Sequence, residues 1–159
     1  VMLGLEGIPA FYIHSLLATE NDTHKLELSG NKRAINRHVW KADELQQVLD
    51  DPASHHHQIL TELKRLIKIR RLQPAFHPNA TQYTLHLGMD IFAYWRQSRN
   101  RAQSIFCIYN LQNQAQQLAL SQVNLVATQN WVDLLSNTVL DDLHQTIEQN
   151  QKTPESTSD

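Results

Sequence analysis

The feature that most constrains this chain of 159 residues is an apolar stripe along one predicted helix. In the segment ASHHHQILTELKRLIKIRRLQP (residues 53–74), apolar side chains recur at the spacing of one helical face, at Ile59, Leu60, Leu63, Leu66 and Ile67. Basic residues near the end suit the helix dipole, and a proline follows. The pattern predicts a helix over residues 55–72 whose stripe needs other elements to cover it.

Three further segments precede this helix. GIPAFYIH (residues 7–14) is a nearly continuous apolar run, which is typical of a strand in a parallel sheet covered on both faces, so we expect a strand over residues 8–14. Residues 16–38 have no sustained period and predict a long loop, which can include one helical turn. KADELQQVLDDP (residues 41–52) predicts a short helix that stops at its proline.

After residue 78 the pattern changes to short strand-like runs separated by polar turns. The runs are TQYTLHLG (81–88), IFAYWRQS (91–98), SIFCIYNLQ (104–112), QQLALSQVNL (116–125) and WVDLLSNT (131–138). Successive short strands of this kind predict an antiparallel meander or sandwich. The polar residues 149–159 predict a disordered tail.

The chain is therefore predicted to divide into residues 1–78, residues 79–148 and the tail. One parallel-type strand and one amphipathic helix cannot form a domain, because neither buries its apolar face alone. We interpret residues 1–78 as the last β/α unit of something larger.

Composition excludes several classes of function. The net charge of −2 and the isoelectric point near 6.5 provide no general attraction for nucleic acid or for an anionic membrane. No apolar run approaches the roughly 20 residues of a membrane-spanning helix. The only cysteine, Cys107, cannot form an internal disulfide and favours a reducing, cytoplasmic location.

Three motifs carry a resemblance to a known family. GIPAFYIHSLLATEND (7–22), GNKRAINRH (30–38) and AFHP (75–78), in this order and spacing, resemble the sucrose phosphorylase branch of the α-amylase superfamily. Within it, the phosphorylases of glucosylglycerate and of sucrose 6′-phosphate are most similar. The resemblance implies an α/β plus all-β fold: the last β/α unit of a (β/α)8 TIM barrel, followed by a small antiparallel β C-terminal domain.

The resemblance also implies substrate-binding residues, because loops after the strands of a TIM barrel form its active-site face. Arg37 corresponds to an arginine that hydrogen-bonds sugar hydroxyls in the glucose subsite, and a guanidinium offers five rigid donors for this purpose. Asn36 either fixes the loop or reaches a hydroxyl, and Arg33 is a candidate for binding an anionic acceptor. His14 ends the predicted strand and either lines the floor of the pocket or is a structural histidine.

The chemistry itself is expected to lie outside this chain. A retaining glycosidase mechanism needs a nucleophilic carboxylate and a second carboxylate as acid/base. In the family these groups follow earlier barrel strands, so we expect no catalytic residue, metal or cofactor here. The resemblance implies a parent enzyme that transfers a glucosyl unit from a donor sugar to inorganic phosphate. Its partners would include the missing N-terminal barrel segment, and this chain alone is expected to be inactive.

Other candidate residues have simpler interpretations. His55, His56 and His57 cannot share a metal ion, because consecutive helical residues point about 100° apart, and we interpret them as a solvated helix start. Glu20 and Asp22, with His14 nearby, are weak candidates for an acid/base set, since nothing positions them. In the family they border the acceptor subsite.

The aromatic and thiol side chains of the β region predict a core. Cys107 lies in an apolar run with no basic neighbour to lower its pKa. Trp95 and Trp131 belong to separate predicted strands, so core packing is preferred over a sugar-stacking platform.

An alternative function remains open at the level of sequence. The chain could be a free-standing, non-catalytic β-module that binds carbohydrate or protein. A preceding strand that carries an aspartate would identify it as part of a phosphorylase instead.

Overall fold

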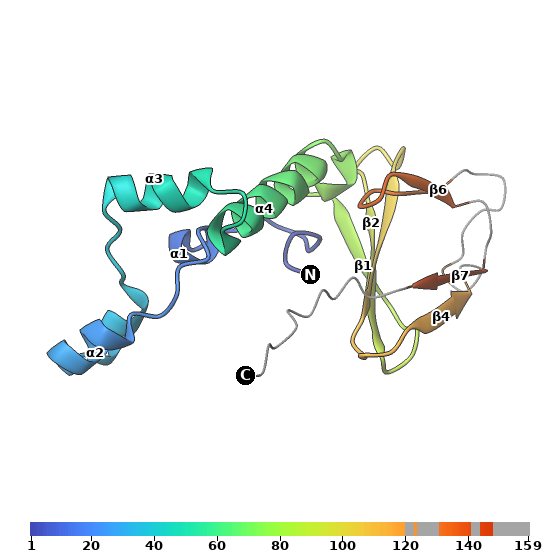
Figure 1. The fold of residues 1–159 in the computed structure, drawn as a ribbon. Helices are drawn as coiled ribbons and strands as arrows, with labels where there is room; N and C mark the ends of the chain where they lie inside the picture. The colour runs from blue at the N-terminus through green and yellow to red at the C-terminus, as the bar shows by residue number, and fades with distance from the viewer. Residues whose placement is uncertain (120–122, 124–130, 141–143, 148–159) are drawn as a thin grey trace. The chain divides into compact units, whose positions relative to one another are not determined.

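The computed structural model describes residues 1–119, 123, 131–140 and 144–147 (Figure 1). The chain divides into two compact units, each with its own set of elements. Unit 2 is Ile8–Leu72, and unit 1 combines Val1–Gly7 with Gln73–Asp159.

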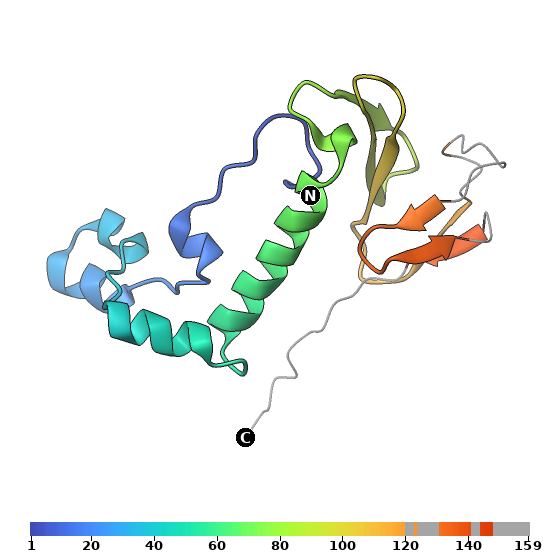
Figure 2. The same ribbon diagram turned by 90° about the horizontal axis from the view of Figure 1, so that it is seen from above.

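Unit 2 contains only helices among its secondary-structure elements. They are α1 (Ile13–Leu16), α2 (Thr23–Ser29), the 3-10 helix η1 (Lys32–Asn36), α3 (Ala42–Asp50) and α4 (His55–Arg71). The helices predicted over residues 41–52 and 55–72 are confirmed as α3 and α4, which pack against each other (Figure 2). The hydroxyl of Ser54 caps α4 by accepting a hydrogen bond from the backbone N–H of His56 at 3.2 Å.

The strand expected over residues 8–14 is wrong for this structure. Residues 8–12 form no strand, and Ile13–Leu16 is helical. The physical reason is that a strand needs at least one neighbour to pair its backbone N–H and C=O groups, and the described residues of unit 2 include no other strand. Without such neighbours the run is not buried either, and Ile8 is 83% exposed.

The long loop predicted over residues 16–38 is also corrected, because it contains α2 and η1. Helix α2 is defined at both ends by its sequence. The Asp22 carboxylate accepts a hydrogen bond from the Lys25 N–H at 2.8 Å, and Gly30 ends the helix in the left-handed conformation, with φ of 62°. Seven residues are too few to show a helical period, so only these caps mark α2 in the sequence.

The apolar stripe of α4 is partly covered. Ile59 is 41% exposed, while Leu60, Leu63, Leu66 and Ile67 are half-buried. The buried residues of α4 are polar ones, His56 and Arg70.

Unit 1 contains the strands. β1 (Thr81–Leu85), β2 (Ile91–Gln97) and β3 (Ser104–Asn110) form an antiparallel meander, in which Tyr83 pairs with Trp95 and Trp95 with Phe106. β4 (Gln116–Ala119) pairs with β7 (His144–Ile147), and β5 (Trp131–Asp133) pairs with β6 (Thr138–Leu140), both antiparallel. The first three predicted strands are confirmed. The fourth, predicted over residues 116–125, is confirmed over Gln116–Ala119, whereas Val123 has 3-10 conformation and the other residues of this run lie outside the described ones.

The fifth predicted strand, residues 131–138, is corrected to a hairpin. β5 ends at Asp133, and Asn137, with φ of 60°, lies in the turn before β6. β7 has no counterpart in the sequence prediction. The predicted disordered tail, residues 149–159, lies outside the described residues.

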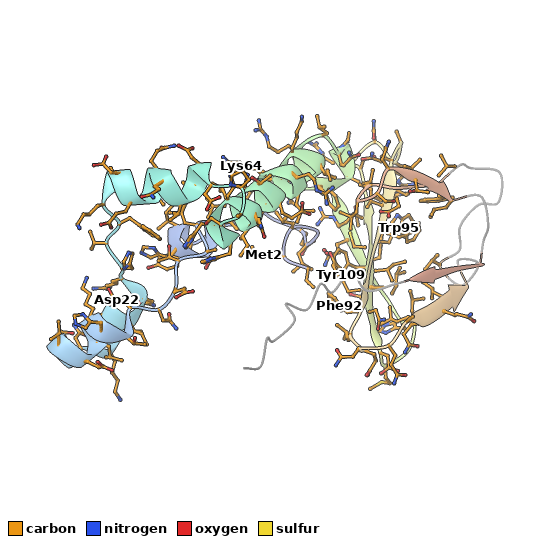
Figure 3. The ribbon with its side chains drawn as sticks, viewed as in Figure 1. Met2, Asp22, Lys64, Phe92, Trp95 and Tyr109 are labelled. Atoms are coloured by element: carbon orange, nitrogen blue, oxygen red, sulfur yellow. The ribbon has the colours of Figure 1, made fainter. Side chains whose placement is uncertain are left out.

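The sheet β1–β2–β3 has two different faces (Figure 3). On one face Trp95 stacks on Phe106 with ring centroids 5.9 Å apart, and Trp131 lies 5.2 Å from Phe106. Both tryptophans are half-buried and pack against Phe106, so the core interpretation of Trp95 and Trp131 is confirmed in part. The apolar cluster around Leu118 and Val123 also includes residues of this face, and its other members are Leu85, Leu87, Ile91, Phe106, Ile108 and Leu140.

The opposite face carries Phe92 and Tyr109 (Figure 3). Tyr94, which is only 1% exposed, lies on the same face by the strand register. The Tyr94 hydroxyl donates to the carbonyl of Val1 at 3.1 Å and lies 3.0 Å from the Tyr109 hydroxyl. Gly4 is required at this approach, because a Cβ there would collide with the Tyr94 hydroxyl and come within 3.0 Å of the Cys107 sulfur. Burial raises the pKa of Tyr94, Cys107 and Tyr109 above their usual values.

Arg96 is the largest polar side chain buried in unit 1, with 0% exposure. Its guanidinium donates to the carbonyls of Ala75 at 3.3 Å, His77 at 3.0 Å and Ala80 at 3.4 Å. The first two acceptors belong to the AFHP motif, which lies around the 3-10 helix η2 (Pro74–Phe76). Arg96 thus joins β2 to the segment that precedes β1.

In the part of the chain that the structure describes, every helix is too short or too polar to cross a lipid bilayer.

Candidate functional site

Three of the four predicted substrate-binding residues lie on one turn of unit 2. Arg33 and Asn36 belong to η1, and Arg37 directly follows it with φ of −125° and ψ of 46°. The side chains of all three are exposed to solvent, whereas Ala34 between them is only 7% exposed. The guanidinium of Arg37 makes no hydrogen bond or ion pair with the described residues, so it is available to a ligand.

The fourth residue, His14, lies apart from this turn in its contacts. It belongs to α1, is half-buried, and its Nδ1 lies 3.2 Å from the hydroxyl of Thr19. No hydrogen bond among the described residues joins its side chain to Arg33, Asn36 or Arg37. The structure therefore brings together the three residues of the GNKRAINRH motif. His14 does not join them and instead contacts Thr19.

The turn is tied through a hydrogen bond to Asp22 at the start of α2, the side chain labelled in Figure 3. The backbone N–H of Asp22 donates to the carbonyl of Ile35 at 2.6 Å. Its carboxylate faces His38, with Nδ1 3.5 Å from Oδ2. The hydrogen bond from the Lys25 N–H, opposed by partial burial and aided by His38, holds the pKa of Asp22 below its usual value.

This environment argues against a role for Asp22 as general acid. One carboxylate oxygen already caps α2, and the lowered pKa keeps the group ionised at neutral pH. Glu20, the other member of the weak acid/base set, is exposed. The described residues of this turn therefore present exposed hydrogen-bond donors and no positioned pair of carboxylates.

The residues that follow the turn take part in a cluster of aromatic and imidazole rings. It is formed by His38, Trp40 and His56. The Trp40 ring lies edge-on to His38 at 4.8 Å and to His56 at 5.2 Å. Its indole N–H donates to the Thr19 hydroxyl at 2.9 Å, which is the same hydroxyl that contacts His14. Trp40 thus connects residues from three separate segments of unit 2.

The triple histidine is corrected here. His56 is only 8% exposed, and its Nδ1 donates to the carbonyl of Leu17 at 2.7 Å, so it is not part of a solvated helix start. His57 similarly donates to the carbonyl of Leu49 at 2.7 Å, and His55 is exposed. The 100° rotation between helical neighbours that prevents shared metal binding also turns one histidine of the three toward the interior. Among the described residues no three potential ligand side chains converge.

Sequence reasoning did not single out Trp40 or His56 for this role. Trp40 follows the INRH motif by two residues, which is a weak signal, and His56 differs from its neighbours only in the direction of its side chain. Both depend on contacts between residues far apart in the chain.

Together, the exposed guanidinium and amide groups form a polar surface on an anchored turn. Comparison with curated proteins specifies the class. The chain is 45% identical over 85 residues to the glucosylglycerate phosphorylase of Allomeiothermus silvanus, which covers 54% of this chain and 15% of that protein. It is 32% identical over 111 residues to the glucosylglycerate phosphorylase of Spirochaeta thermophila. These residues make up 70% of this chain and 19% of that protein.

A glucosylglycerol phosphorylase of Marinobacter adhaerens is 39% identical over 70 residues, covering 44% of this chain and 13% of that protein. No protein-family model matches the chain. The predicted resemblance is confirmed: the curated homologues are glucosylglycerate and glucosylglycerol phosphorylases, which are sucrose phosphorylase-like enzymes. The chain spans less than a fifth of the length of these relatives.

Proposed function

We propose that this chain is part of a retaining glycoside phosphorylase that transfers a glucosyl unit between a donor sugar and inorganic phosphate. The observation that carries the proposal is the 45% identity over 85 residues with a glucosylglycerate phosphorylase. In this proposal residues 1–78 belong to a (β/α)8 barrel, to which they contribute the loop of Arg37 and helix α4, and residues 79–148 form a C-terminal β domain. The enzyme acts in the cytoplasm.

Arg37 is the residue that we propose to contact the glucosyl unit. Its exposed guanidinium can hold two sugar hydroxyls, or a hydroxyl and a carboxylate, through its fixed set of donors. Asn36 supplies an amide beside it, and Arg33 lies on the same turn as a cation for the anionic acceptor or phosphate. His14 has a supporting role through Thr19.

The chain contributes binding, and the remaining barrel supplies the acid/base and nucleophilic carboxylates. A retaining mechanism requires two carboxyl groups about 5–5.5 Å apart. Phosphate then replaces water in attacking the glucosyl-enzyme intermediate. The missing segment of the barrel is therefore the partner that this chain requires for activity.

Two measurements test the proposal. The purified 159-residue chain should release no glucose 1-phosphate from glucosyl donors, and activity in a rigorously purified sample would contradict the assignment of the chemistry to other segments. A chimera in which this chain replaces the homologous segment of the Allomeiothermus silvanus enzyme should phosphorolyse glucosylglycerate. A folded chimera without that activity would overturn the proposal.

In the chimera, Arg37→Ala should lower kcat/KM by roughly a hundredfold, because hydrogen bonds from a charged donor are each worth about 1.5–3 kcal/mol. Arg33→Ala is the matched control. It removes an equal charge from the same turn and should act mainly on KM for the acceptor or phosphate. Near-normal kinetics of Arg37→Ala with glucosyl donors would show that the wrong arginine is assigned.

A further inference from the structure

Three consecutive carbonyl groups on the turn of Arg37 accept hydrogen bonds from three different places in unit 2. The backbone N–H of Asp22 donates to Ile35 at 2.6 Å. The hydroxyl of Tyr12 donates to the Asn36 carbonyl at 2.7 Å, and the ammonium of Lys25 donates to the Arg37 carbonyl at 2.9 Å. The backbone is thus held from outside at every residue from 35 to 37.

These hydrogen bonds from outside the turn matter because η1 has few stabilising interactions within itself. It is a single 3-10 helix of five residues, and short helices of this type are marginal in water. Its only buried residue is Ala34, and the bond from the Arg37 N–H to the Ala34 carbonyl, at 3.1 Å, is its last. The conformation that displays Asn36 and Arg37 is therefore maintained largely by the three outside donors.

The two side-chain donors are not explained by core packing. Tyr12 is 51% exposed, and its ring contacts His14 only edge-on at 5.2 Å. Lys25 lies in the first turn of α2. The Asp22 carboxylate fixes this turn by accepting a hydrogen bond from the backbone N–H of Lys25. Asp22 thus contributes its backbone to Ile35 and its side chain to the orientation of Lys25.

We propose that Tyr12 and Lys25 are positioning residues that set the direction of the Arg37 side chain for binding of the glucosyl unit. The inference rests on the proposed function, because it assumes that Arg37 contacts the donor sugar. Tyr12 acts through a neutral hydroxyl and Lys25 through a charge-assisted bond, so the loss of Lys25 has the larger effect. Neither residue needs to touch the substrate.

The first test measures the turn itself in the 159-residue chain by nitrogen-15 relaxation and amide chemical shifts. Tyr12→Phe, which removes only the hydroxyl, and Lys25→Met should lower the backbone order of residues 36 and 37. Lys25→Arg should restore it, because a guanidinium can donate to the same carbonyl. The matched controls are Tyr83→Phe and Lys64→Met, whose side chains are exposed and make no hydrogen bond with the described residues.

The second test measures kinetics in the chimera with the Allomeiothermus silvanus enzyme. Tyr12→Phe should raise KM for the glucosyl donor about three- to tenfold, with KM for phosphate unchanged. Lys25→Met should exceed that increase, and Lys25→Arg should retain most of the affinity. A general loss of stability would instead alter both KM values and would not be rescued by arginine.

The outcomes separate this inference from the proposed function. If Tyr12→Phe leaves the order and shifts of residues 36 and 37 unchanged, the inference is overturned, whatever Arg37→Ala does. If the turn loosens but neither variant nor Arg37→Ala affects the donor KM, the wrong arginine is assigned and the positioning role is overturned, while the phosphorylase activity of the chimera is judged separately. Loosening together with a selective rise in donor KM supports both.

Discussion

The two units of this chain are stabilised in different ways. Unit 1 buries large side chains completely, with Tyr94 at 1% and Arg96 at 0% exposure, and its strands satisfy one another's backbone groups. In unit 2 the residues classed as buried are Ala34, His56 and Arg70, while Ile8, Leu28 and Val39 are more than 70% exposed. Unit 2 relies on helix caps and on side-chain hydrogen bonds to backbone carbonyls.

This difference in burial indicates that unit 1 is stabilised by its own core, whereas unit 2 is not. A paired sheet with its own core is independent of ligands, and such scaffolds commonly support function from elsewhere. A unit with few buried apolar side chains is only weakly stabilised by itself, as expected for the substrate-contacting role proposed for it above. The following predictions would break or sharpen this contrast.

Amide hydrogen exchange should give the largest difference between the units. Strand β2 should exchange only through global opening of unit 1, because it is paired with β1 on one edge and with β3 on the other, and the β3 amides that donate to β2 should be protected with it. Residues 8–12, which lack a strand partner, should exchange near the rate of an unfolded peptide. Protection of residues 8–14 equal to that of residues 104–110 would mean that this run had found a strand partner in the chain.

Arg96→Met should destabilise unit 1 by about 3 kcal/mol or more, since it leaves several buried carbonyls without their charged donor. Urea unfolding followed by tryptophan fluorescence measures the change. Arg99→Met, which removes an exposed arginine three residues away, should stay within about 0.5 kcal/mol of the wild type. Equal midpoints for the two variants would show that Arg96 is not a principal support of this unit.

Gly4→Ala should cost about 1–3 kcal/mol, because the added methyl group collides with the buried Tyr94 hydroxyl. The same substitution in a Tyr94→Phe background should cost less, since the colliding oxygen is then absent. A double-mutant cycle measured by urea unfolding gives this coupling. Strictly additive effects would contradict the assigned contact between residues 1–7 and the sheet.

Acidification should weaken α2 slightly. The pKa of Asp22 is lower in the folded chain than in an unfolded one, so its stabilising effect is complete above the ordinary aspartate pKa, near 4. The effect is lost as the pH falls through the lower folded value. The Lys25 amide shift should follow this transition, and Asp22→Asn should abolish it. Glu20→Gln, two residues earlier, should leave the transition in place.

The extent to which the sequence predicted the candidate site differs from residue to residue. The motif GNKRAINRH places Arg33, Asn36 and Arg37 within five residues, so a single local turn brings them together, and their role as ligands stays a prediction. His14 was assigned to the end of a strand that this structure does not form. Trp40, His56 and Tyr12 reach the site region through contacts across 21, 39 and 24 residues. No periodicity reports contacts of that kind.

Local sequence patterns determined the helices and strands whose hydrogen bonds join residues close together in the chain. The caps and prolines around α3 and α4, and the alternating runs of β1, β2 and β3, specify hydrogen bonds between near neighbours or adjacent strands. The tertiary structure alone decided that residues 8–12 lack a strand partner and that Arg96 is buried against the AFHP segment. Strand pairing and the burial of a charge both depend on which distant groups are present to satisfy the backbone and the cation, and a short window of sequence does not contain those groups.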